Sequence, residues 1–308
     1  MDNVAPASIV SLIASATEIL CALGLRDRLV GVSHECDFPE DIRGLPVLSV
    51  PKVDPALPGG EIDRRVREIV AEGLSVYRIR TEELARLRPD LIVTQDQCEV
   101  CAVSLKDVEE AVGALTLKAT RVCSLSPNKL EDIVEDFRRV AAAAGVAGRG
   151  EELVVSFGDR LAKLREKTSQ AAGRPAVACL EWLDPLMVAG GWMPELVRIA
   201  GGEPVLVSES EPFRKVDWET LAEADPDVIV VMPCGFPIDR TLEELRDRRT
   251  GDMLRSIRAT REGRCFLADG NAYFNRPGPR IAESAENLAG LLHPDIFGGT
   301  TTSERWLG

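Results

Sequence analysis

Short apolar runs alternate with longer amphipathic stretches from the start of the chain. Residues 9–13 and 29–33 are apolar runs of strand length. The stretch between them opens with Ser15-x-x-Glu18, a capping-box pattern, and ends at Gly24, which predicts a helix. Strands that alternate with helices in this way favour an α/β fold with parallel sheets.

The second half of the chain opens with the same alternation. An apolar run at 176–181 predicts a strand, and the stretch from about Pro194 to Gly201 and Gly202 predicts a helix. Proline suits the first turn of a helix, and glycine suits the position past its last turn. We therefore expect two α/β halves of similar construction.

An internal repeat supports this division. Residues 84–93 (LARLRPDLIV) match residues 221–230 (LAEADPDVIV) at six of ten positions. Each copy predicts the end of a helix, a Pro-Asp turn and a buried strand that leads into a cysteine-bearing loop. A capping-box pattern follows each loop, at 104–107 and at 241–244.

The segment between the halves has apolar residues at helical spacing. Gly145 and Gly148 divide it into two predicted helices, and the second, within about 148–172, is long and highly charged. A long helix between two lobes is a stiff connector. We expect an N-terminal α/β lobe at 1–127, a helical connector at 128–173 and a C-terminal α/β lobe at 174–308.

Composition narrows the classes of function. The chain has 308 residues and a formal net charge of −13, so it lacks the basic stripe that nucleic-acid binding needs. It has no apolar run of the roughly 18 residues that predict a membrane span. The amino terminus lacks the regions of a secretory signal, which predicts a cytoplasmic protein as written, and a periplasmic or extracytoplasmic one if a leader was removed. We expect a monomer.

Signatures of common enzyme classes are absent from the sequence. It has no Gly-x-Gly-x-x-Gly after the first predicted strand, no phosphate-binding loop and no Gly-x-Ser-x-Gly elbow. We therefore expect a binding protein that is not an enzyme and requires no cofactor.

The loops that follow the predicted strands are the candidate ligand site, because ligands of open parallel sheets bind beyond the carboxyl ends of the strands. Aromatic residues are 5% of the chain, yet they gather on these loops. Each one alone could pack under its own loop, but together they favour a flat apolar ligand held between two faces. The candidate walls are Phe38, Trp182, Trp192, Phe236, Tyr273 and Phe274, and the candidate polar contacts are Gln95, Gln97, Asn275 and Arg276.

Eight cysteines are too few for a disulfide scaffold of this length. Those in apolar segments, namely Cys21, Cys179 and Cys265, are expected to be buried free thiols. A second set offers the four ligands of a tetrahedral zinc site, namely His34, Cys36, Cys98 and Cys101. Cys101, near a predicted helix start, also suits a reactive thiolate. In the alternative interpretation Cys36, Cys98 and Cys234 are uncoordinated thiols in the wall of the ligand site.

Several segments resemble a known family. Residues 9–24 (IVSLIASATEILCALG) and 29–33 (LVGVS) resemble the opening of the helical-backbone (class III) substrate-binding proteins of ABC importers, in particular their cobalamin-binding, vitamin B12 periplasmic binding protein-like branch. The resemblance covers roughly residues 8–298. Four loops are similar to a cysteine-bearing subgroup of that branch: 34–39 (HECDFP), 95–101 (QDQCEVC), 232–236 (MPCGF) and 269–279 (DGNAYFNRPGP).

The resemblance implies two Rossmann-like lobes bridged by one long α-helix, with the ligand sandwiched in a cleft between the lobes. It also implies an acidic residue on each lobe that docks onto an ABC permease, for which Glu18 and Glu195 are the candidates. Each has a structural alternative, since Glu18 completes a capping box and Glu195 favours a helix dipole.

A corrinoid such as cobalamin is the expected ligand. A corrin ring is broad, apolar on its faces and fringed with amides, so it needs aromatic walls and scattered polar partners. Haem ranks second, with Tyr273 or Cys98 as an axial ligand. An anionic siderophore ranks third, because Arg276 is the only clear basic residue on these loops.

Overall fold

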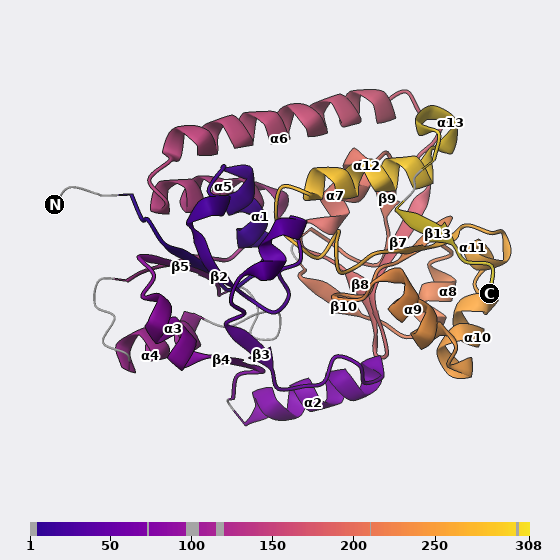
Figure 1. Cartoon of the computed structure of the whole chain (residues 1–308). Coiled ribbons are helices and arrows are strands. Elements are labelled where there is room, and N and C mark those ends of the chain that lie inside the picture. Colours follow the sequence, from indigo (N-terminus) through magenta and orange to yellow (C-terminus); the bar gives the residue numbers. More distant parts are fainter. Residues whose placement is uncertain (1–4, 73, 97–104, 115–119, 210, 300–301) are drawn as a thin grey trace. The chain divides into compact units, whose positions relative to one another are not determined.

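The chain folds into two α/β units (Figure 1). The computed structural model describes residues 5–72, 74–96, 105–114, 120–209, 211–299 and 302–308. By packing, unit 1 comprises Met1–Leu57, Arg64–Pro127 and Glu131–Ser156, and unit 2 comprises Pro58–Asp63, Asn128–Leu130 and Phe157–Gly308. The expected boundaries at residues 127 and 173 remain predictions.

Unit 1 is built on a parallel sheet of four strands in the order β2-β1-β5-β6. The strands are β1 (Ile9–Ser11), β2 (Leu29–Val32), β5 (Leu91–Gln95) and β6 (Arg121–Leu125). A separate antiparallel pair is formed by β3 (Ser49–Pro51) and β4 (Tyr77–Ile79). The helices of this half are α1 (Ala14–Ala22), η1 (Arg26–Arg28), η2 (Glu40–Gly44), α2 (Gly59–Ala71), α3 (Thr81–Leu87) and α4 (Leu105–Ala114).

A core cluster explains why these elements hold together. Val10 of β1 and Leu12, which directly follows that strand, pack with Ile92 of β5. Residues of β4, α3 and α4 complete the cluster, so the strand pair and two helices share one core with the sheet.

Unit 2 is built on a mixed sheet of seven strands in the order β10-β8-β7-β11-β12-β13, with β9 paired to β7. Parallel sheets were expected in both halves, and in this half the parallel strands are joined by antiparallel ones. Strands β7, β9, β11 and β12 are parallel, whereas β8 returns from β7 as a hairpin and β10 and β13 pair antiparallel at the edges. The strands are β7 (Ala176–Leu183), β8 (Leu186–Ala189), β9 (Glu203–Pro204), β10 (Phe213–Lys215), β11 (Val228–Val231), β12 (Cys265–Ala268) and β13 (Ser303–Arg305).

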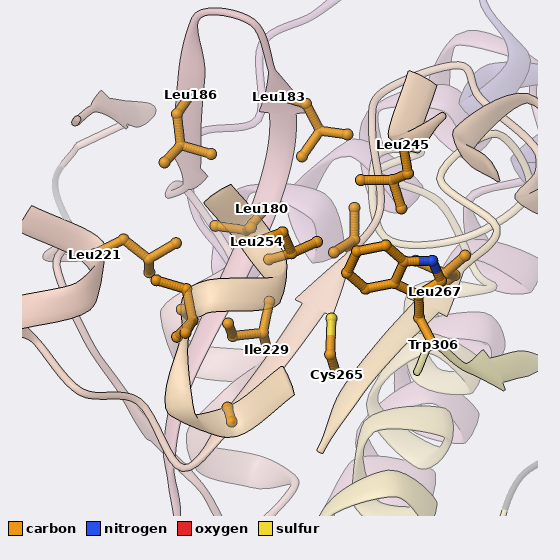
Figure 2. Close-up of a cluster of buried hydrophobic side chains, with 14 of the residues drawn as sticks. Leu180, Leu183, Leu186, Leu221, Ile229, Leu245, Leu254, Cys265, Leu267 and Trp306 are labelled. Atoms are coloured by element: carbon orange, nitrogen blue, oxygen red, sulfur yellow. The ribbon is translucent and has the colours of Figure 1, made fainter. Parts of the chain in front are cut away.

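The core of unit 2 is a cluster of leucines closed by an aromatic residue (Figure 2). Leu180 and Leu267 of the sheet meet Leu221, Leu254 and Trp306. The helices that supply this cluster are α8 (Trp218–Glu223), α9 (Ile238–Leu245), α10 (Arg248–Ser256) and α11 (Arg258–Arg261). Elsewhere in the unit, α7 (Met193–Ile199) packs with α12 (Ile281–Leu292), which also contacts α13 (Pro294–Phe297).

The connector forms two helices, as predicted, namely α5 (Leu130–Ala143) and α6 (Ala147–Thr168). Gly145 separates them with a φ of +74°, a conformation that L side chains rarely adopt. Gly148, predicted to help break the segment, lies inside α6 instead. The 22-residue α6 begins in unit 1 and ends in unit 2.

Two predicted capping boxes are wrong. Helix α1 begins at Ala14, so Ser15 lies within the helix and its buried hydroxyl finds no partner in the described part of the chain. Helix α9 begins at Ile238, and the Thr241 hydroxyl donates to the Pro237 carbonyl at 3.3 Å. Both helices start earlier than the pattern predicted, so each hydroxyl-bearing residue lies within its helix and does not cap it. Ser104 lies outside the described residues.

The two copies of the internal repeat fold alike. Each helix is followed by a residue with positive φ: Arg88, at 43°, comes directly after α3, and Asp225, at 41°, is the second residue after α8. A proline follows each, and then β5 or β11 begins. The predicted sequence of helix end, Pro-Asp turn and buried strand is confirmed in both halves.

Candidate ligand-binding edge

Three parallel strands of unit 2 end at one edge of the sheet, and the loops that follow them are joined. The Gly235 N–H donates to the Gly270 carbonyl at 3.3 Å, and the Gly270 N–H donates to the Phe236 carbonyl at 3.0 Å. A Cβ at Gly270 would stand 2.1 Å from the Pro233 carbonyl oxygen, so this close approach needs glycine. The predicted loops after β11 and β12 therefore form one surface.

An aromatic pair lies at this edge. Trp182, at the end of β7, lies with its ring 5.2 Å from that of Phe236 at an interplanar angle of 49°. The indole N–H of Trp182 donates to the Asp184 carbonyl at 2.9 Å, which fixes the orientation of the ring. The structure thus brings together two of the predicted wall residues, one half-buried and one buried.

A charged network supports the pair, and the sequence did not predict it. The guanidinium of Arg240 lies over the Phe236 ring, 4.5 Å from its centroid, and pairs with Glu244 at 2.7 Å. Glu244 also accepts from the backbone N–H of Gly59, 3.1 Å from each carboxylate oxygen. This first turn of α2 packs with unit 2. The phenyl ring is therefore held by a cation whose own position is fixed.

The predicted wall residues on and beside the loop after β12 differ in how deeply they are buried. Phe274 is 1% exposed and its N–H donates to the Ser284 hydroxyl at 3.0 Å, so it lies in the core, contrary to the prediction of a ligand wall. The Trp192 indole N–H donates to the Phe274 carbonyl at 2.7 Å, which holds a half-buried Trp192 against this loop. Tyr273 is half-buried, with the Arg280 guanidinium 5.4 Å from its ring centroid.

Two polar residues predicted to contact a ligand, Asn275 and Arg276, form hydrogen bonds within the loop after β12, and Asn275 also bonds to the loop after β11. The Asn275 side-chain amide donates to the carbonyls of Met232 and Gly270, both at 3.0 Å. Arg276 is 8% exposed and donates to Asn271 Oδ1 at 2.9 Å. These bonds give both residues a positioning role, and their contact with a ligand remains a prediction.

Glu181 lies at the same edge and was not among the predicted site residues. It occupies an irregularity in the pairing of β7 with β8, where Leu180 faces Val188 and Trp182 faces Met187. Burial raises the pKa of its carboxyl to about 8, so the group is mostly neutral at pH 7. The one available signal was a single acidic residue at the end of an apolar run.

In unit 1, the Cys36 thiol points toward hydroxyl groups. Its sulfur lies 3.1 Å from Thr17 Oγ1 and 3.4 Å from Ser33 Oγ, and Thr17 in turn donates to Ser11 Oγ at 2.8 Å. Burial raises the pKa of the thiol, which keeps it protonated. The described neighbours of the sulfur are thus hydroxyl groups, which is compatible with the uncoordinated thiol of the alternative interpretation.

His34 is held by its neighbours. Its Nδ1 lies 2.7 Å from the Ser49 hydroxyl, its ring centroid lies 5.3 Å from that of Tyr77, and burial lowers its pKa. Among the described residues, no cluster of three or more potential metal ligands occurs. The other predicted members of the zinc set, Cys98 and Cys101, lie outside the described residues together with Gln97.

The remaining candidates differ in exposure. Phe38 is 45% exposed, whereas Gln95 at the end of β5 is 1% exposed. The Cys234 side chain is exposed. Glu18 is 4% exposed, contrary to the exposed position that docking to a permease requires, and Glu195 is half-buried in the first turn of α7.

Cys179 and Cys265 are buried, as expected for structural thiols, and burial raises the pKa of each to about 12. Cys21, also expected to be buried, is half-buried.

A family model described as "Periplasmic binding protein" matches residues 9–272. The chain is similar to the uncharacterized ABC transporter substrate-binding lipoprotein YvrC of Bacillus subtilis, with 24% identity over 95% of this chain and 82% of that protein. It is also similar to the vitamin B12-binding protein of Yersinia pestis, with 24% identity over 91% of this chain and 84% of that protein. The expected cytoplasmic location finds no support in a periplasmic family with a lipoprotein relative.

The fold is shared with solved structures. A periplasmic heme binding protein from Pseudomonas aeruginosa superposes with a TM-score of 0.72 at 21% identity, covering 94% of each chain. This likeness establishes the predicted fold class. Within the part of the chain that the structure describes, no helix is long and apolar enough to cross a membrane.

Proposed function

This chain belongs to the periplasmic binding protein family and is a substrate-binding protein of the ABC importer type, and we propose that its ligand is a corrinoid such as cobalamin. The observation that carries the proposal is the pairing of Trp182 with Phe236 at the carboxyl edge of the unit 2 sheet. This is where open parallel sheets bind ligands. An aromatic surface held in a fixed orientation suits the broad apolar face of a corrin ring.

The sequence relatives support the same ligand class. Several proteins that this chain resembles over most of its length are named vitamin B12-binding proteins. The amide fringe of a corrin needs polar partners beside the aromatic surface, and Asn275, Arg276 and Glu181 all lie on the same edge. A ligand of this kind would be delivered outside the cytoplasm to a membrane permease, which is the partner that we propose.

Haem is the second candidate. Tyr273 lies on the loop after β12 with a phenol that could serve as an axial ligand to iron, and Arg280 next to it could pair with a haem propionate. Solved structures of the same fold include haem-binding proteins. Siderophores rank third, because the described arginines of this edge, Arg240, Arg276 and Arg280, are engaged with Glu244, Asn271 and the Tyr273 ring.

A titration panel on the purified chain separates these ligands. Cyanocobalamin, dicyanocobinamide and hemin are titrated side by side at pH 7 by isothermal calorimetry. We expect both corrinoids to bind with micromolar or tighter affinity and hemin to bind more weakly. Tight hemin binding without any corrinoid binding would replace the proposal with the second candidate.

A further inference from the structure

Glu181 occupies an unusual position in β7. Two steps along β7, from Leu180 to Trp182, correspond to one step along β8, from Val188 to Met187, so Glu181 is the extra residue of a β-bulge. Bulges redirect a side chain and are common beside binding sites. On the other side, the Cys234 N–H donates to the Glu181 carbonyl at 3.1 Å, so the bulge is anchored to the loop after β11.

The carboxyl of Glu181 has no hydrogen-bond or ion-pair partner among the residues that the structure describes. A half-buried acid without a partner is costly for a fold when it is ionised. It lies next in sequence to Trp182, whose ring forms the aromatic pair with Phe236. The bulge at Glu181 thus lies beside the residue that forms the aromatic pair, and the hydrogen-bonding capacity of its carboxyl is not used by the described residues.

The elements around Glu181 carry other titratable and charged groups. They are Cys179 and Asp184 of β7 and its turn, Cys234 after β11, Arg240 and Glu244 of α9, and Tyr273, Arg276 and Arg280 after β12. The raised pKa of Glu181 has burial as its cause, with no offsetting contribution from the described arginines. These arginines are engaged with Glu244, Asn271 and the Tyr273 ring.

We propose that Glu181 binds the ligand as a neutral carboxylic acid, which donates its proton in a hydrogen bond to a peripheral amide carbonyl of the corrinoid. The inference rests on the proposed function and identifies a residue that determines specificity. A protonated carboxyl is a donor, whereas an ionised one only accepts. Glu181 therefore offers a hydrogen-bond donor to an acceptor oxygen of the ligand at this point, which an ionised carboxylate could not do.

The pH dependence of binding follows from the direction of this bond. Below about pH 8 the free protein already carries the proton, so affinity is constant there. Above that pH the proton must be taken up before the ligand binds, so the dissociation constant rises by about tenfold for each pH unit. We expect cyanocobalamin to bind about tenfold more weakly at pH 9 than at pH 7.

Glu181→Gln tests the bond because glutamine keeps a neutral N–H donor and does not titrate. We expect this variant to bind cyanocobalamin within about threefold of wild type at pH 7 and to lose the weakening at pH 9. Glu223→Gln, on the exposed surface of α8 in the same unit, is the matched control and should keep the wild-type pH profile. Thermal unfolding of each protein without ligand verifies that all are folded.

The outcomes are distinct. No corrinoid binding by wild type at pH 7 would overturn the proposed function and this inference with it. Corrinoid binding with a flat wild-type profile, or with a slope that persists in Glu181→Gln, would overturn this inference alone. Affinity that rises with pH would also overturn it, because the ionised carboxylate would then be the bound form.

Discussion

The carboxylate of Asp227 accepts a hydrogen bond from the backbone N–H of Ala176, the first residue of β7, at 2.9 Å. Asp90 makes the equivalent contact in unit 1, accepting from the N–H of Ser8 at 3.0 Å, directly before β1. Both aspartates come from the Pro-Asp turns of the internal repeat. The repeat therefore fixes the start of the first strand in each unit with the same bond.

Replacing Asp227 with Ala should lower the free energy of unfolding by about 1 kcal/mol, because an N–H at the strand start loses a charged acceptor that is itself partly solvated. These backbone bonds lower the pKa of both aspartates. Their contribution is present above the unfolded pKa, near 3.8, and is lost as the pH falls below it. Urea denaturation at pH 7 and pH 3 measures both effects.

Glu72→Ala, at an exposed position after α2, serves as the control for Asp227→Ala. A variant at Asp227 that is no less stable than this control would show that the repeated bond has no role in stability.

The Glu181 side chain should also affect the stability of the protein without ligand. Its folded pKa, about 8, is above the unfolded value near 4.5. As the pH rises from 4.5 to 8, the unfolded chain ionises before the folded one, so wild type loses stability over this window. Glu181→Gln lacks this ionisation. The difference in unfolding free energy between the two proteins should grow with pH until about pH 8, and equal profiles would contradict the raised pKa.

Gly270 should be sensitive to the smallest side chain. An alanine Cβ would meet the Pro233 carbonyl oxygen at 2.1 Å and force the loops after β11 and β12 apart. We expect Gly270→Ala to destabilise the protein by about 2 kcal/mol and to weaken ligand binding. Gly173→Ala is the control, since a Cβ there meets nothing within 4 Å. Thermal unfolding that is equal in both variants would show that the loops tolerate separation.

The described thiols should differ in reactivity. Cys234 is exposed, whereas Cys36, Cys179 and Cys265 are buried and have raised pKa values. Brief alkylation of the native protein at pH 8, followed by peptide mass mapping, should label Cys234 well before these three. Early labelling of Cys36 would contradict its buried, protonated position and would restore the thiol-site interpretation.

Local patterns predicted most of the framework, because they depend on neighbours in sequence. The apolar runs located β1, β2 and β7, and the helical spacing after residue 128 located α5 and α6. The hairpin of β8 was missed, since the pattern after Leu183 does not distinguish a return strand from a loop. The capping boxes failed because the helix start depends on packing as well as on the hydroxyl position.

The residues that hold the candidate site in place make contacts between distant parts of the sequence, which local sequence patterns do not reveal. Glu244 meets Gly59 across 185 positions of sequence, and this contact fixes Arg240 over Phe236. The redirection of Glu181 arises from strand pairing. Phe274 matched the aromatic composition of a ligand wall, yet its backbone bond to Ser284 places it in the core. Residue type alone did not distinguish aromatic residues that could contact a ligand from those that pack in the core behind them.

The most direct test of the account is calorimetric titration of cyanocobalamin into wild type, Trp182→Ala and Phe297→Ala at pH 7. Phe297 is a half-buried aromatic residue on α13, which follows α12, and serves as the matched control. We predict micromolar or tighter binding to wild type and Phe297→Ala, and at least about tenfold weaker binding to Trp182→Ala, the loss expected for one aromatic contact of about 1.4 kcal/mol. Equal affinity of Trp182→Ala and wild type, with both folded, would contradict the assignment of this edge as the ligand site.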